Sequence, residues 1–215
     1  MKIGVAVLVL LVWTLPAYAA GPTLFKEFSY GQPRVEIQKL PGITPCDDVE
    51  KGALCRQKQS FAGYDGWDQA FLFNDGKLTL VALAGPTDNA LYTKVLGVMT
   101  NNGFILAALQ SGDKLFDFIN VLHEKGEKAA VAGLTAFEAS ALNGDTGLTY
   151  TFAAKDAMKG AAKLGSYAQF VLNAPDSLRA TEFEVSEDGM SVRFIAPKAA
   201  LKDMKRQMEG QKESF

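Results

Sequence analysis

Two stretches of this chain alternate apolar and polar side chains and then reverse direction at a short acidic turn. In the first, residues 69–73 and 78–83 flank the turn Asn74-Asp75-Gly76-Lys77. Asp-Gly between two apolar runs is a strong β-hairpin signal, because both central positions of the tight turn favour positive φ. The spacing therefore predicts a hairpin, which restricts the chain to folds that contain an antiparallel sheet.

The second stretch repeats this pattern with residues 181–185 and 190–195 around the turn 186–189. Its alternation is cleaner, because Phe183 lies between Glu182 and Glu184 in the sequence. Apolar and acidic residues that alternate with a period of two lie on opposite faces of a strand. We therefore expect one face of this hairpin to meet water.

A helix is predicted after each hairpin. After Pro86, Thr87 or Asp88 can cap a helix that ends at Asn101-Asn102-Gly103. After residue 195, Pro197 can occupy the first turn of a helix with an apolar stripe, followed from about residue 205 by a frayed, charged tail. The stripe consists of Ala200, Leu201, Met204 and Met208. The two hairpin-and-helix units are compatible with a weak internal duplication, although generic domains also repeat such units.

The segments between the two units are predicted with more ambiguity. Residues 104–110 favour a buried strand, and Asp113 is expected to start a helix that ends at Gly126. Residues 129–142 mix helix-forming and strand-forming side chains, and we favour a strand over 135–142 that forms a hairpin with 148–153. Finally, we expect a short helix near 155–163 and a strand over 167–172. The predicted fold class is α+β, an antiparallel sheet of hairpins packed by three or four helices.

The beginning of the chain resembles a targeting segment. Lys2 precedes an uninterrupted apolar run over residues 3–13, and Ala17-Tyr18-Ala19 has small residues at the two positions that a signal peptidase recognises. The run is shorter than the roughly 20 residues of a membrane-spanning helix, so a retained anchor is the weaker interpretation. We expect a signal peptide that is cleaved after Ala19, with cleavage after Ala20 as the alternative.

The mature chain, residues 20–215, is then expected to be periplasmic or secreted, without a membrane anchor. Its length suits one α+β domain, with two half-units as the alternative. The whole chain has 22 basic and 24 acidic side chains, so it has no cationic excess with which to neutralise a phosphate backbone. Nucleic acid is therefore not an expected partner.

The only two cysteines, Cys46 and Cys55, lie in this exported part. In an oxidising compartment a disulfide between them is the expected pairing. Three nearby anions, Asp47, Asp48 and Glu50, oppose a reactive thiolate, and the spacing is not that of a Cys-x-x-Cys redox motif. We therefore predict a structural disulfide and not a redox or metal centre.

Residues that carry common chemistries are scarce in the sequence. The single histidine, His123, is expected near a helix end as a capping or boundary residue, and no second histidine completes a zinc site. No nucleotide-binding glycine motif occurs, so no cofactor is predicted. Oxygen-bearing side chains gather at residues 47–50 and 143–147, but both segments lack the spacing of a calcium loop and are interpreted as turns. No catalytic residue is predicted, although pairs of carboxylates cannot be recognised from spacing alone.

One segment combines flat aromatic rings with glycines and carboxylates. In residues 61–68, Tyr64 and Trp67 stand beside Asp65, Asp68 and two glycines, just before the first hairpin. Such rings can contact a ligand or a protein partner. The alternative is that the glycines form a turn and the rings pack on the hairpin.

These observations favour a non-enzymatic, exported binding or interaction module that contacts a protein or a small ligand in the cell envelope. Two alternatives remain. One is an envelope structural or assembly protein whose sheet edge pairs with another chain. The other is a hydrolase that uses carboxylates alone.

Overall fold

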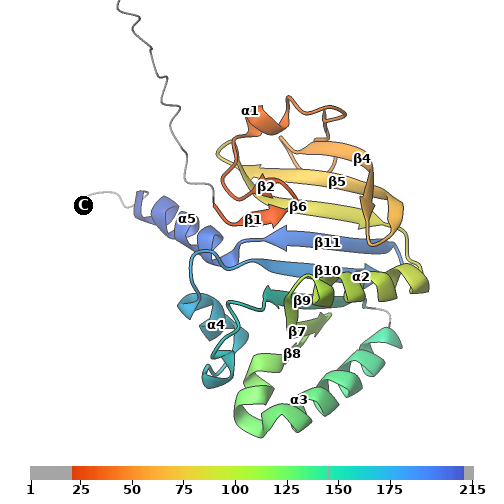
Figure 1. Cartoon of the computed structure of the whole chain (residues 1–215), viewed down its shortest axis with the longest axis vertical. Coiled ribbons are helices and arrows are strands. Elements are labelled where there is room, and N and C mark those ends of the chain that lie inside the picture. Colours follow the sequence, from red (N-terminus) through yellow and green to blue (C-terminus); the bar gives the residue numbers. More distant parts are fainter. Residues whose placement is uncertain (1–20, 145, 211–215) are drawn as a thin grey trace, which may run out of the picture.

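A computed structural model describes residues 21–144 and 146–210. The fold is α+β, as predicted, and in these residues nine antiparallel strands form one sheet (Figure 1). The strand order is β3-β4-β5-β6-β11-β10-β9-β7-β8. The strands are β3 (Thr44–Pro45), β4 (Leu54–Phe61), β5 (Tyr64–Asn74), β6 (Lys77–Gly85), β7 (Phe104–Ser111), β8 (Lys114–Asp117), β9 (Leu148–Ala154), β10 (Ala180–Ser186) and β11 (Gly189–Ile195).

Helices and one small hairpin surround this sheet. Figure 1 shows α3 at the end of the sheet formed by β7 and β8, and α4 and α5 beside one another at the left. The elements are the hairpin β1 (Thr23–Phe25) and β2 (Phe28–Ser29), the helices α1 (Arg34–Ile37), α2 (Asn89–Asn101), α3 (Phe118–Leu142), α4 (Tyr167–Asn173) and α5 (Pro197–Gly210), and the 3₁₀ helix η1 (Ala161–Lys163). Among the helices of residues 21–144 and 146–210, none has an apolar stretch of the length that spans a bilayer.

Both predicted hairpins are confirmed. Strands β5 and β6 reverse at Asp75 and Gly76, whose φ angles of 49° and 71° are the positive values that the turn requires. Strands β10 and β11 pair from Ala180 opposite Ile195 to Ser186 opposite Gly189. On the outer face of this second hairpin, Arg193 lies 3.1 Å from Glu182 in a half-exposed ion pair. That face meets water, as the alternation predicted.

The helices that follow the hairpins are also confirmed. The side chain of Asp88 caps α2 by accepting a hydrogen bond of 2.7 Å from the backbone N–H of Leu91. At the other end, Gly103 has a φ of 77°, which ends the helix as expected. Helix α5 begins at Pro197, as predicted, but continues to Gly210, beyond the point at which the sequence suggested fraying. Residues 211–215 lie outside the described residues.

The two hairpin-and-helix units lie side by side. Strands β6 and β11 pair antiparallel, with Leu83 opposite Val192 and Val81 opposite Phe194. Two copies related by a two-fold axis through this junction would have the same arrangement, since each unit presents its second strand to the other. This adjacency is the arrangement that a duplication would produce, and the duplication stays a hypothesis.

The predicted start of α3 is wrong. Asp113 lies in the turn between β7 and β8, because Gly112 adopts a φ of 57° and reverses the chain there. The helix begins four residues later, where Asp117 accepts a hydrogen bond of 3.0 Å from the N–H of Asn120. Gly126 has non-helical angles and interrupts the helix where a cap was predicted, but a second helical part follows it.

The predicted hairpin of residues 135–142 with 148–153 is also wrong. Residues 127–142 form the second part of α3, since their alanines, leucines and glutamates favour a helix over a strand. Gly133 lets this helix approach the sheet, because a Cβ atom there would lie 2.8 Å from the ring of Phe116. Strand β9 exists as predicted but pairs with β7 and β10.

Two smaller expectations also change. Residues 167–172 are not a strand: they belong to α4, whose start is capped by Ser166 through a 3.2 Å hydrogen bond from the N–H of Gln169. The helix that was expected near 155–163 is reduced to turns and the short 3₁₀ helix η1.

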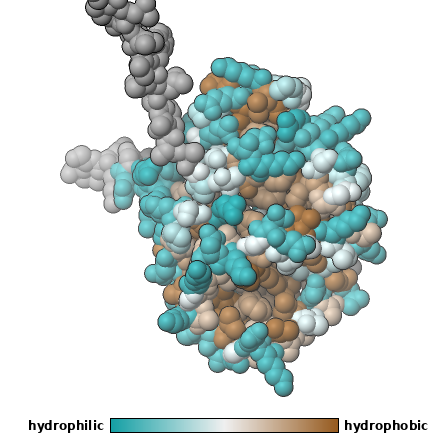
Figure 2. Space-filling view, viewed as in Figure 1, coloured by the Kyte–Doolittle hydropathy of each residue, from teal (hydrophilic) through white to brown (hydrophobic). Residues whose placement is uncertain are grey.

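Apolar side chains pack on both faces of the sheet. The larger core lies between one face and the β1–β2 hairpin, α2 and the second part of α3. The smaller core contains Ala153, Ile119, Phe170 and Val171. Phe152 belongs to the larger core and Ala153 to the smaller one, and neighbouring residues of a strand point to opposite faces. Figure 2 shows polar side chains over most of the viewed surface, with apolar areas between them.

Candidate functional site

A cleft of about 710 Å³ separates α5 from the first segments of the described chain. This volume is in the range of small-molecule sites in proteins. One wall comes from the β1–β2 hairpin and the loop that leads into α1, and the other comes from α5. The lining residues are Gly21, Pro22, Glu27, Ser29, Tyr30, Gly31, Gln32, Pro33, Glu36, Lys77, Asp176, Ala199, Lys202, Asp203 and Arg206.

The first wall depends on a close backbone approach. Tyr30 donates its backbone N–H to the carbonyl of Pro22 at 2.9 Å, which holds the two sides of the hairpin together. A Cβ atom at Gly21 would lie 2.4 Å from the carbonyl oxygen of Tyr30. Any larger residue at position 21 would therefore clash with the backbone of this wall.

The two walls meet at Tyr30 and Asp203. The Tyr30 hydroxyl donates a hydrogen bond of 2.8 Å to Oδ2 of Asp203, whose other oxygen lies 3.1 Å from Arg206. Burial raises the pKa of Tyr30 well above its usual range, and the hydrogen bond to Asp203 raises it further. The phenol therefore keeps its proton well above neutral pH and donates it from one wall of the cleft to Asp203 on the other.

Further polar contacts attach α5 to the body. Lys202 forms an ion pair with Asp176, and Gln207 donates to Asp75 at 3.2 Å. Two of the three cations that line the cleft are thus paired with carboxylates from the same lining. Ion pairs in the described part of the chain do not include the third cation, Lys77, or the lining carboxylates Glu27 and Glu36.

This arrangement is suited to binding a polar ligand. The hydroxyls, amide and charged groups of the lining can all form hydrogen bonds with polar groups of a ligand. The residues in the described ranges include no cluster of three or more potential metal ligands, so no metal is assigned to the cleft. The lining residues come from segments far apart in the sequence, and none of them was predicted to be a site residue.

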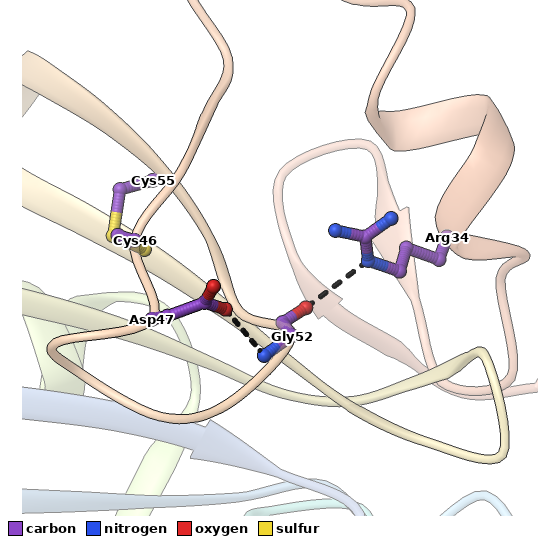
Figure 3. Close-up of a disulfide and its surroundings, with 5 residues drawn as sticks. All are labelled: Arg34, Cys46, Asp47, Gly52 and Cys55. Atoms are coloured by element: carbon purple, nitrogen blue, oxygen red, sulfur yellow. Dashed lines mark hydrogen bonds between the residues drawn. A yellow bond between two sulfur atoms is a disulfide. The ribbon is translucent and has the colours of Figure 1, made fainter.

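The predicted disulfide is present between Cys46 and Cys55, with 5.8 Å between their Cα atoms (Figure 3). It joins β3 to β4 at the edge of the sheet, since Thr44 lies opposite Cys55. Within the closed loop, Gly52 donates its N–H to Asp47 at 2.7 Å and its carbonyl accepts from Arg34 at 3.0 Å. The disulfide therefore also fixes a loop that contacts α1.

The two aromatic residues proposed as contacts occupy different environments. Trp67 is fully buried, and its Nε1 donates a hydrogen bond of 2.9 Å to the carbonyl of Phe61. Tyr64 remains 38% exposed, with its ring edge-on to Trp67. The burial of Trp67 corresponds to the packing alternative, and only Tyr64 remains available at the surface. Neither residue lines the large cleft.

His123 lies on the exposed side of α3, just before the interruption at Gly126. Its Nδ1 lies 2.9 Å from the carbonyl oxygen of Ala162, in η1. The side chain thus connects α3 to η1, which follows β9 in the chain. His123 therefore occupies a boundary position of the kind expected.

A second polar cluster was missed by the sequence analysis. Glu138 of α3 accepts hydrogen bonds from the hydroxyls of Tyr92 and Tyr150, which also contact each other. Burial raises the pKa of Tyr92 to about 12 and that of Tyr150 further. The cluster joins α2, α3 and β9, and its residues do not line the cleft beside α5. Its residues are 12 to 58 positions apart, so no local pattern could reveal it.

Comparisons of the chain with protein-family models, with curated proteins and with solved structures gave no match.

Proposed function

We propose that this protein is an exported, non-enzymatic binding module whose ligand occupies the cleft between the β1–β2 hairpin and α5. The cleft carries the proposal, because its volume fits a small molecule and its lining combines apolar surface with ten polar or charged side chains. The disulfide between Cys46 and Cys55 is consistent with an oxidising compartment. Export itself rests on the leader, residues 1–19, which lies outside the described residues.

The charges of the lining favour a polar ligand. Lys202 and Arg206 are paired with Asp176 and Asp203, so their charges are largely balanced within the protein. Lys77, Glu27 and Glu36 are exposed at the cleft and are free of such pairs in the described part of the chain. A ligand with both a cationic and an anionic group would complement them.

The assembly alternative has less support from the sheet edges. Strand β3 has two residues and β8 has four, so both edges offer few backbone groups to another strand. Beyond β3, the outer side of β4 is interrupted at Lys58, which has a φ of 57°. A charged residue in a bulge is a common protection against strand addition.

The proposal is tested by native mass spectrometry of the mature protein purified gently from its own envelope extract. We expect a bound mass on the wild type. Ala199 lines the cleft and its neighbour Ala200 does not, so Ala199→Trp should remove the bound mass and Ala200→Trp should leave it unchanged. A second variant, Lys77→Glu, alters an exposed lining charge without filling partly buried space.

Circular dichroism and thermal unfolding should first verify that each variant is folded. A wild type without any bound mass would contradict the proposal, as would equal retention by all the variants. Turnover of glycan or ester substrates that is lost on a single carboxylate substitution would favour the hydrolase. Recovery only in large envelope complexes would favour the assembly protein.

A further inference from the structure

Helix α5 is oriented differently from most amphipathic helices on a protein surface. Met204 and Met208 of its apolar stripe are 49% and 62% exposed. Together with Ala200, which is also exposed, they lie on one face, since residues four positions apart in a helix are neighbours. The stripe that sequence patterning would place against the core is therefore largely in solvent.

Polar contacts explain this orientation. Asp203 and Gln207, which are also four positions apart, contact Tyr30 and Asp75 on the body of the protein. Lys202 adds its ion pair with Asp176. These polar side chains fix one side of the helix against the cleft, and the methionines therefore point elsewhere.

The neighbouring helix α4 adds another exposed apolar side chain. Leu172 of α4 is 53% exposed, and the Nζ of Lys198 donates to its carbonyl oxygen. Leu201 is half-buried and packs on the smaller core next to α4. We call the surface formed by Leu172, Met204 and Met208 the methionine face.

Cations accompany the methionine face. Helix α5 contains four basic and two acidic residues, whereas the chain as a whole has more acidic than basic residues. Lys202 and Arg206 are paired with carboxylates at the cleft, and the ion pairs of the described residues do not include Lys198, Lys205 or Glu209. An apolar stripe flanked by lysines and arginines is the pattern of helices that lie in the surface of an anionic bilayer.

We propose that the methionine face docks on the surface of an anionic lipid bilayer, with Lys198 and Lys205 at the headgroups. The charges of α5 that are not paired within the protein select this partner, because two cations and one anion leave a positive charge, which opposes that of anionic headgroups and differs in sign from that of the whole chain. A second copy of the chain fits less well, since three side chains are far fewer than the roughly 20 residues per side of a stable interface. The inference is independent of what occupies the cleft.

The test measures co-sedimentation of the mature protein with vesicles of phosphatidylcholine and phosphatidylglycerol, and with vesicles of phosphatidylcholine alone. We expect binding to the anionic vesicles that weakens as salt is added. The double variant Met204→Gln/Met208→Gln should lose this binding. Lys205→Gln should weaken it about fivefold, which corresponds to roughly 1 kcal/mol for one cation at the surface.

Matched controls lie far from α5 in the sequence. Val35 of α1 is 61% exposed and Lys94 of α2 is exposed, so Val35→Gln and Lys94→Gln remove similar groups elsewhere and should not change the binding. Because the substituted side chains are all at the surface, the variants should remain folded, which thermal unfolding will verify.

Three results would overturn the proposal. The first is an absence of wild-type binding to the anionic vesicles, and the second is equal binding to both kinds of vesicle. The third is a wild-type dimer in analytical ultracentrifugation that the methionine double variant dissociates, which would make the face an interface between copies of the chain.

Discussion

Tyr30 donates its phenolic hydrogen to Oδ2 of Asp203 at 2.8 Å, across 173 positions of sequence. The contact joins the first hairpin of the described chain to its last helix. Because the same two residues line the cleft, the hydrogen bond also sets the distance between the cleft walls. Binding in the cleft and the attachment of α5 therefore depend on the same pair of groups.

Removal of the Tyr30 hydroxyl should loosen α5. We expect Tyr30→Phe to lower the free energy of unfolding by about 1–2 kcal/mol, because Asp203 loses a donor but keeps Arg206 and some contact with water. Urea unfolding measures this loss. Tyr64→Phe is the matched control, since the Tyr64 ring is partly exposed, and it should cost much less. Equal losses in the two variants would show that the contact contributes nothing specific.

The tyrosines around Glu138 predict a loss of stability at alkaline pH. A tyrosine whose pKa is raised on folding stabilises the native state below the unfolded pKa of about 10, and this contribution disappears as pH rises through the folded value. Burial raises the pKa of Tyr92 to about 12 and that of Tyr150 further. Urea unfolding should show a decline above about pH 10.

The matched variant is Tyr150→Phe, in which the decline above about pH 10 should be shallower because one raised pKa has been removed. The free energy of unfolding at neutral pH should also fall, since Glu138 loses one of its two donors. An alkaline decline identical to that of the wild type would contradict the assignment.

The buried indole of Trp67 should matter for stability. Trp67→Ala is expected to lower the free energy of unfolding by about 3–5 kcal/mol, because it leaves a large cavity in a well-packed region. Thermal unfolding should therefore shift down by several degrees. A normal melting temperature combined with loss of a ligand or partner would instead mean that Trp67 belongs to a binding surface.

A neighbouring glycine tests the same packing from the other side. A Cβ atom at Gly85 would lie 2.8 Å from Cε3 of the Trp67 ring. Gly85→Ala should therefore destabilise the protein, and the destabilisation should be smaller in a Trp67→Leu background, where the ring is absent. Additive effects of the two substitutions, measured in a double-mutant cycle, would contradict the close contact.

The disulfide should stabilise the fold by a moderate amount. The double variant Cys46→Ser/Cys55→Ser is expected to lose roughly 2.5–3 kcal/mol of unfolding free energy, which is the chain-entropy value for a loop of about ten residues. Addition of a reductant should destabilise the wild type similarly and leave the double variant unchanged. A wild type with two free thiols under denaturing, non-reducing conditions would contradict the pairing.

Local chemistry explains why parts of the fold were predictable. The turn at Asp75 and Gly76 and the cap at Asp88 are set by residues within a few positions of each other, so the sequence indicates them directly. The same holds for the disulfide, because the chain has only one possible cysteine pair. Each of these predictions concerns backbone angles or covalent bonds that neighbouring residues decide.

Tertiary packing explains the errors. Asp113 and Asp117 both precede apolar residues, and only the pairing of β8 with β7 decides which one starts the helix. A strand was predicted over 135–142 because threonine and phenylalanine, which favour strands, are interleaved there. The same segment contains a glutamate and three alanines, which favour a helix. The helix forms because this helical preference is reinforced by the packing of its apolar side on the sheet beside Phe116.

The cleft could not be predicted for a related reason. Its lining combines the hairpin near Tyr30, Lys77 of β6, Asp176 and one face of α5. No pattern within any of these segments indicates that they are neighbours. The segment around Tyr64 and Trp67, in contrast, was proposed as a contact site from its local composition alone. Sequence reasoning therefore found a conspicuous aromatic cluster and missed the larger concave surface.

The occupancy of the cleft is the most direct test of the account. It can be measured in a crystal structure of the mature protein purified from its own cells, without exposure to denaturant. We expect electron density for a polar molecule between Tyr30 and Lys202 in the wild type and its loss in Ala199→Trp. A wild-type cleft that contains only ordered solvent, in a protein whose other properties are intact, would contradict it.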